Sequence, residues 1–224
     1  MIIYWIISAV WFKQDTAETM AGAASSSYYN SVNIGLPIAT YVLGDPTYVI
    51  PALVLQMAVL SPIVIAGLDR GASGVLKSVL AGLTAPVVVA AFAGFAVSAS
   101  SWTVPEPVLT PLEILGGASI PLILMSFGAS LTGEKVLQSH RLPTITATAL
   151  KLIGMPAVAW VVATQMGLTG SDMYAALILC ALPTAQNVYN YAATYRSGEV
   201  ICRDTIFLTT FLALPAMLLI AGVF

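Results

Sequence analysis

The chain has 224 residues, of which 58% are hydrophobic and only 8% are charged, and its formal net charge is −2. A soluble domain carries about 25% charged residues, so this composition excludes a soluble enzyme and predicts an integral membrane protein. No basic run indicates nucleic-acid binding. Cys180 and Cys202 indicate no disulfide framework, and their spacing fits no metal motif.

Hydropathy divides the chain into eight apolar segments, given that a membrane span needs about 20 apolar residues. Each segment is expected to be helical, because lipid offers no hydrogen bonds to exposed backbone groups. The fold class is therefore an all-α integral membrane protein. The segments cover residues 1–12, 27–43, 47–67, 76–99, 112–131, 143–166, 172–194 and 201–223.

The first segment, residues 1–12, reaches only about 18 Å as a helix and is too short to cross a hydrocarbon core of about 30 Å. A signal peptide is the alternative, but no basic residue precedes the apolar run. We therefore interpret this segment as the end of a helix whose beginning lies outside the given sequence.

Connections that carry Lys or Arg alternate along the chain with connections that carry none. The connections that carry Asp45, Glu106 and Asp172 hold no Lys or Arg. The positive-inside rule therefore places the basic connections in the cytoplasm and the C-terminus outside, in a multi-pass protein of the plasma membrane. The basic residues are Lys13, Arg70, Lys77, Lys135, Arg141, Lys151, Arg196 and Arg203.

Two stretches of the chain, which begin at Asn33 and Asn187, match at one constant offset. Each continues through an acidic residue into an apolar segment with a Pro in its second half. Because the two copies lie in segments of opposite direction, they indicate an inverted repeat, which is typical of secondary transporters. The matching residues are Asn33, Ala39, Thr40, Tyr41 and Gly44 in the first copy and Asn187, Ala193, Thr194, Tyr195 and Gly198 in the second.

The copies are five segments apart, which predicts a repeat unit of five helices. The eight segments then divide into a remnant of the first repeat with three helices, residues 1–67, and a second repeat with five, residues 76–224. Two helices and part of a third are expected to precede Met1 in the complete protein.

Three motifs in this order resemble those of the auxin efflux carrier family of membrane transporters, which includes malonate-type carriers. Residues 30–37 (Asn-Ser-Val-Asn-Ile-Gly-Leu-Pro) resemble the family's N-x-G-x-x-G-x-P segment, with Val32 in place of the first Gly. Residues 117–121 and 127–131 resemble its seventh helix, and residues 182–187 (Leu-Pro-Thr-Ala-Gln-Asn) resemble its second signature.

The resemblance implies a protein of ten helices with both ends outside, in which helices four and nine are broken and cross at the centre. The eight segments would be family helices three to ten. The transport domain would then be present, and helices six and seven would remain of the scaffold, through which a homodimer could form. The given chain would be a fragment or start later than the natural protein.

Pro37 and Pro183 are expected to interrupt their segments, because Pro removes a backbone donor and clashes with the preceding turn. The N–H groups exposed at each break favour anions, and the nearby amides add neutral donors and acceptors. The alternative is that these amides only satisfy the freed backbone. The predicted substrate-binding residues are Asn30, Asn33, Gly35, Pro37, Pro121, Ser126, Pro183, Thr184, Gln186 and Asn187.

The other polar and charged residues do not indicate a further functional site. No carboxylate lies deep in a segment, Lys151 is expected to extend its amine toward the membrane surface, and His140 is expected to be solvated. No arrangement of residues indicates an enzyme, a cofactor or a metal site.

The leading hypothesis is a secondary active or facilitative carrier of small organic anions, namely carboxylates, that works by alternating access. The alternatives are a carrier of auxin-like weak acids or neutral metabolites, and a membrane sensor or degenerate fragment without a transport cycle.

Overall fold

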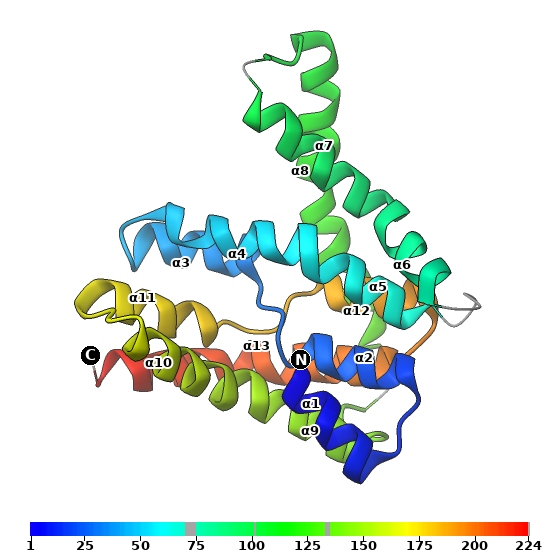
Figure 1. Ribbon diagram of the computed structural model, residues 1–224, viewed down its shortest axis with the longest axis vertical. Coiled ribbons are helices and arrows are strands. Elements are labelled where there is room, and N and C mark those ends of the chain that lie inside the picture. The colour runs from blue at the N-terminus through cyan, green and yellow to red at the C-terminus, as the bar shows by residue number, and fades with distance from the viewer. Residues whose placement is uncertain (70–74, 101, 133–134, 224) are drawn as a thin grey trace.

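The computed structural model describes residues 1–69, 75–100, 102–132 and 135–223, and within these ranges its regular elements are all helices (Figure 1). The predicted all-α class is confirmed. Among the described residues, three helices are long and apolar enough to cross a membrane by length and composition: Pro46–Leu68, Arg141–Gln165 and Glu199–Ala221. Shorter apolar helices cover Ile2–Phe12, Val88–Ala99 and Gly170–Cys180.

The N-terminal helix consists of α1 (Ile2–Ile7) and the π-helical turn η1 (Ser8–Phe12). It is followed by α2 (Thr16–Ser25), a helix that the hydropathy analysis did not predict. Its residues are mostly Ala, Gly, Ser and Thr, whose hydropathy is too low for a window search. The sequence signal for this helix was its N-cap, Asp15, followed by Glu18 three residues later. In the structure, the Asp15 carboxylate accepts a hydrogen bond from Glu18 N at 2.8 Å.

The first broken helix is interrupted at Ser26–Asn30, and the prediction of a break near Pro37 is therefore wrong. After the break, η2 (Ser31–Gly35) and α3 (Leu36–Tyr41) follow each other without a gap. Pro37 lies in the first turn of α3, where the π-helical turn before it has already changed the hydrogen-bond pattern. The helix tolerates the proline there for this reason.

The same combination of a π-helical turn and a proline occurs in two of the long helices. Helix 46–68 consists of η3 (Pro46–Val49), α4 (Ile50–Leu55), η4 (Gln56–Leu60) and α5 (Ser61–Leu68). Helix 141–165 consists of α9 (Arg141–Ala149), η5 (Leu150–Gly154) and α10 (Met155–Gln165). Pro62 and Pro156 each stand two residues after such a turn, as Pro37 does. A wider turn moves the preceding carbonyl groups away from the proline ring, so the helix continues.

The second broken helix consists of α11 (Gly170–Cys180) and α12 (Asn187–Tyr195), and Pro183 lies in the non-helical residues 181–186 between them. The predicted break near Pro183 is confirmed. The long helix α13 (Glu199–Ala221) follows. Helix, break, helix and long helix thus recur in the same order as in residues 16–68. The turns at Gly44 and Gly198 both have positive φ, 78° and 67°.

The region between helix 46–68 and helix 141–165 begins with a helix that packs against α5 and then extends away from the other helices as a hairpin (Figure 1). It consists of α6 (Val75–Thr84), α7 (Pro86–Ala99) and α8 (Glu106–Ser130). The predicted single segment 76–99 is divided at Ala85, whose ψ of 136° is the extended conformation that a following proline favours. A Cβ added at Gly94, Gly116 or Gly117 would meet open space, so these sides of α7 and α8 have no neighbours within the described residues.

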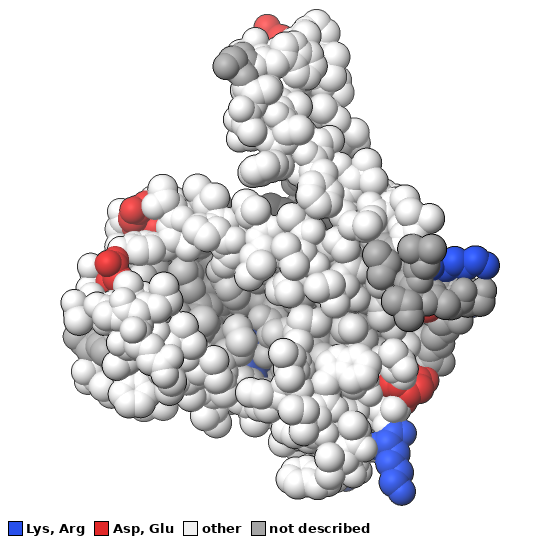
Figure 2. Space-filling model, viewed as in Figure 1, with Lys and Arg blue, Asp and Glu red and all other residues white. Residues whose placement is uncertain are grey.

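Charged side chains gather at the ends of the helices. On the face in Figure 2 the wide middle is almost free of Lys, Arg, Asp and Glu. Large apolar side chains such as Ile63, Trp160 and Leu218 are exposed along the helices. This distribution fits a protein surrounded by lipid.

Candidate functional site: the crossing of the two broken helices

The two breaks contact each other directly and satisfy each other's backbone groups. Asn30 N donates to Pro183 O at 2.9 Å, and the Thr184 hydroxyl donates to Ser25 O, the end of α2, at 2.7 Å. From this crossing, α3 and α11 extend to one side and α2 and α12 to the other (Figure 1). The two broken helices therefore run in opposite directions through one point.

Gly35 allows this close approach. A Cβ at this buried position would lie 3.1 Å from Leu182 Cδ1 and 3.2 Å from Asn30 O. Both distances are tighter than ordinary van der Waals contact, so a larger residue would push the two breaks apart.

The predicted amides divide into two kinds. Asn30 is buried, and its Oδ1 accepts from Asn33 N at 3.1 Å, which caps the helix that starts at Ser31. Asn33 and Gln186 are half-buried, and Asn33 Nδ2 donates to Gln186 Oε1 at 3.3 Å across the crossing. Asn187, also half-buried, begins α12. The Asn30 carboxamide thus serves the backbone, whereas the other three side chains are partly open to a ligand.

The remaining predicted site residues lie at different distances from the crossing. Pro183 and Thr184 are buried within the second break, and the backbone N–H of Thr184 donates to the Thr209 hydroxyl of α13 at 3.1 Å. Pro37 is exposed at the start of α3. Pro121 and Ser126 are exposed on α8 and belong to neither break. Near them, the Phe127 ring meets Tyr189 of α12 edge-on, with centroids 6.0 Å apart.

A polar cluster that the sequence did not indicate joins helix 46–68 to both broken helices. The Ser61 hydroxyl bonds to Tyr191 of α12 at 3.1 Å and receives a hydrogen bond from Tyr28 of the first break at 3.3 Å. Ser31 donates to Gln56 Oε1 at 3.3 Å, and Gln56 O accepts from Ser61 at 2.8 Å. Gln56 begins the π-helical turn η4 and Ser61 follows it, and such turns are frequent at functional sites.

Lys151 was expected to reach the membrane surface, but it is fully buried at 0% exposure. Its Nζ donates to Cys180 O, at the end of α11, at 2.7 Å and lies 6.0 Å from the centre of the Tyr29 ring in the first break. The lysine therefore contacts both breaks from a third helix. The signal in the sequence was a cation within an otherwise apolar span, which by default suggests a function.

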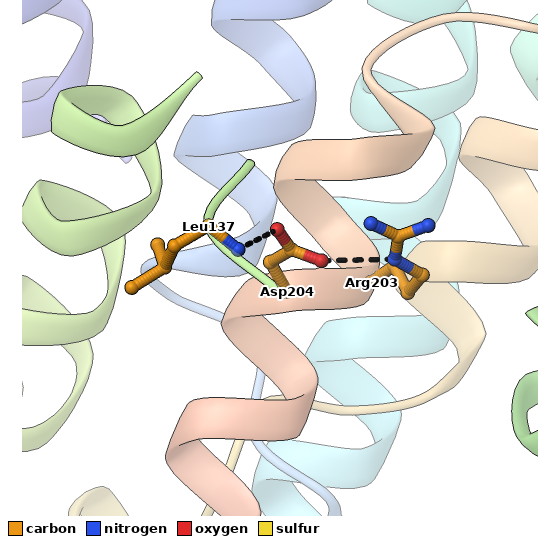
Figure 3. A network of polar contacts seen from close by, with 3 residues as sticks. All are labelled: Leu137, Arg203 and Asp204. Carbon is orange, nitrogen blue, oxygen red and sulfur yellow. Dashed lines mark hydrogen bonds and ion pairs between the residues drawn. The ribbon is translucent and has the colours of Figure 1, made fainter. Parts of the chain in front are cut away.

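The sequence analysis did not single out Asp204, which lies near the start of α13. Its side chain is fully buried in α13, where its Oδ1 accepts from Arg203 Nε at 2.8 Å and its Oδ2 accepts from Leu137 N at 2.8 Å (Figure 3). The burial arises because the connection before α9 folds over the start of α13. This contact ties that connection to the helix bundle.

The sequence profile of a family described as "Membrane transport protein" matches residues 72–221, which is more than half of the chain. The chain belongs to this family. The resemblance to auxin efflux carriers is thereby confirmed. A protein of Methanocaldococcus jannaschii named as an uncharacterized transporter is 28% identical over 107 residues. These residues are 48% of this chain and 34% of that protein, so the match spans about a third of the relative's length.

Membership of a membrane transport family and the relative's name point to a transporter rather than an enzyme. The crossing of the two broken helices is the candidate site in this family member. It combines partly open amides with helix ends inside an apolar bundle, and such discontinuous helices are where many transporters bind their substrates.

Proposed function

We propose that the protein is a carrier of small organic anions, namely carboxylates, which works by alternating access around the crossing of the two broken helices. The observation that carries the proposal is the hydrogen bond from Asn33 Nδ2 to Gln186 Oε1, beside the bond from Asn30 N to Pro183 O. These contacts join the two halves of the fold at one point that a rocking motion would open from either side.

The amides at this point suit a carboxylate. Asn187 Nδ2 and Gln186 Nε2 are donors on half-buried side chains, and both lie where α12 begins. The start of a helix carries about half a positive charge, which favours an anion at this end. A carboxylate that binds here would accept from these amides and displace the Asn33–Gln186 hydrogen bond.

We further propose that the chain contains eight membrane spans of a ten-helix protein. Residues 1–67 would be the remnant of one inverted repeat, and residues 76–224 would form the other. The recurring order of helix, break, helix and long helix in residues 16–68 and 170–221 supports this division. The α7–α8 hairpin would belong to the scaffold, through which a homodimer could form.

We propose a plasma-membrane orientation with the basic connections in the cytoplasm and the C-terminus outside. Two contacts support the separation of the connections. Tyr48 OH donates to Asp172 Oδ1 at 2.8 Å, which joins two connections without basic residues. A Cβ at Gly198 would collide with Ala21 of α2, so the connection that carries Arg196 packs against the helix that follows Lys13.

Uptake into proteoliposomes tests the substrate class. The complete gene product would be reconstituted and offered labelled malonate, succinate and malate, with indole-3-acetate and glycerol as the weak-acid and neutral alternatives. We expect saturable uptake of at least one of the three carboxylates, competed by the other two and absent from empty liposomes. Saturable uptake of glycerol alone would contradict the anion proposal. Binding of these carboxylates without uptake would indicate a sensor.

A further inference from the structure

Lys151 holds an unusual position for a buried lysine, because it bonds to the end of α11 beside one break and lies over the Tyr29 ring of the other, while belonging to neither. It lies in η5, in the middle of the span Arg141–Gln165. Its Nζ donates to the last carbonyl group of α11, Cys180 O, and faces the Tyr29 ring of the other break. Its exposure is 0%, so the amine is enclosed by these elements.

A buried ammonium group needs a compensating negative charge, since charges are costly to bury in a membrane protein. The neighbouring helix α13 contains a buried carboxylate, Asp204. Among the described residues, this carboxylate pairs with Arg203 and accepts a hydrogen bond from Leu137 N. The group that faces Lys151 is instead the C-terminal end of α11. Such an end carries about half a negative charge, which offsets part of the cost of burying a cation beside it.

The end of the other interrupted helix is closed differently. Ser25 O, at the end of α2, accepts from the neutral Thr184 hydroxyl of the opposite break at 2.7 Å. The two half-helix ends at the crossing therefore differ, since a hydroxyl closes one and an amine closes the other. In transporters with discontinuous helices, half-helix C-terminal ends and unwound carbonyl groups coordinate the coupling Na⁺ or H⁺. The Lys151 amine occupies such a position.

We propose that Lys151 is a tethered cation. Its ammonium group takes the place of a coupling Na⁺ at the end of α11 and supplies the positive charge that balances a carboxylate at the crossing. The first half of this statement concerns the protein alone, and the second half rests on the proposed function. The protein then binds and carries its anion without a sodium ion.

Thermal unfolding without substrate tests the first half. The complete protein, Lys151→Ala and Lys151→Met would be purified in detergent and heated in choline chloride, NaCl or ethylammonium chloride at equal ionic strength. The parent should have the same Tm in NaCl and choline chloride. Lys151→Ala should unfold several degrees lower in choline chloride and recover in ethylammonium chloride, because the small ammonium ion fits the vacated space and can donate to Cys180 O.

Two variants control this measurement. Lys151→Met keeps the length of the apolar stem and leaves no space, so ethylammonium should not change its Tm. Lys13→Met removes an exposed lysine outside the crossing and should not respond either. A Lys151→Ala protein that can be purified only with ethylammonium would support the proposal. It would be overturned by a parent Tm that rises in NaCl relative to choline chloride, or by a Lys151→Ala Tm equal in choline and ethylammonium.

Uptake of labelled succinate into vesicles tests the second half. Replacing Na⁺ by choline should leave the parent rate unchanged, Lys151→Met should lose uptake at least tenfold, and ethylammonium should restore part of it to Lys151→Ala. A parent that requires Na⁺, or a Lys151→Met protein as active as the parent, would refute the role in transport. If the parent transports none of the carboxylates, the proposed function fails, while the thermal measurement still decides whether Lys151 is a tethered cation.

Discussion

Asn33 and Gln186 are 153 residues apart in the sequence, and their side chains share a hydrogen bond of 3.3 Å. The internal repeat and the two prolines were enough to select both residues as members of a site. The same reasoning could not predict that the Asn30 side chain caps the helix at Ser31, because that role depends on where the break falls. The sequence was thus sufficient to select these residues as members of one site, but it did not predict which of them caps a helix.

Lys151 and Asp204 show the opposite case, since the sequence predicted that Lys151 would reach the membrane surface and gave no indication of a role for Asp204. In the structure both are fully buried. The end of α11 covers Lys151, and the backbone around Leu137 covers Asp204. Contacts between elements far apart in the chain decide this burial, and one sequence without a structure does not reveal them.

Replacement of Asn33 or Gln186 by Ala should weaken carboxylate binding. One neutral hydrogen bond contributes about 0.5–1.5 kcal/mol, and one to a charged group up to about 3 kcal/mol, so the expected loss of affinity is roughly threefold to two-hundredfold. Calorimetry with malonate or succinate on the complete protein measures it. Thr40→Ala is the matched control, because Thr40 is exposed and bonds within its own helix. Unchanged affinity in both amide variants would place the binding site elsewhere.

Asp204→Asn should lower the stability of the protein. The change removes the charge that compensates buried Arg203, and removal of one partner from a buried ion pair typically costs about 3–5 kcal/mol. Thermal unfolding in detergent should show a clear fall in Tm. The matched control is Asp45→Asn, where the exposed carboxylate bonds only with nearby Thr47 and the expected change is within about 0.5 kcal/mol. Equal Tm values for the two variants would mean that the Asp204 ion pair contributes little.

At the scale of elements, hydropathy predicted the long apolar helices to within a few residues, as in 143–166 against Arg141–Gln165. It missed α2, because small residues allow a helix to pack closely without raising its hydropathy. It also assigned the first break to Pro37, whereas a π-helical turn accommodates that proline and the break lies at Ser26–Asn30. A proline indicates a local irregularity, and the neighbouring residues decide whether it becomes a wide turn or a break.

Pro183→Ala should therefore reduce transport more than Pro37→Ala. Pro183 lies within the break between α11 and α12, where an alanine would permit an i→i−4 hydrogen bond and favour a continuous helix. Pro37 already lies inside a helical segment, so alanine there changes little. Initial rates of succinate uptake at equal protein density provide the comparison. A larger loss for Pro37→Ala would show that the break near Pro183 is not what transport needs.

At the scale of the molecule, the charged connections separate into two groups along the helices. Tyr48 and Asp172 hold together the end that carries Asp45. Leu137 and Asp204 tie a basic connection to the start of α13. Because α13 and helix 46–68 each run the length of the bundle, these contacts fix opposite ends of the same body (Figure 1). The sequence predicts two sides for these connections, since all Lys and Arg residues other than Lys151 lie in or beside alternate connections.

The membrane should therefore separate residues 13 and 135 from residues 45 and 172. Single cysteines at these four exposed positions, introduced with Cys180 and Cys202 replaced by Ser, would be treated in intact cells with a membrane-impermeant maleimide. The variants Asp45→Cys and Asp172→Cys should react from outside, because the positive-inside rule places the connections without basic residues there. Lys13→Cys and Lys135→Cys should react only after the membrane is permeabilised. Permeabilised cells also control for expression, since all four variants should then be labelled. Reaction of residues 13 and 45 from the same side would contradict both the orientation and the assignment of the intervening helices, since an odd number of crossings must separate them.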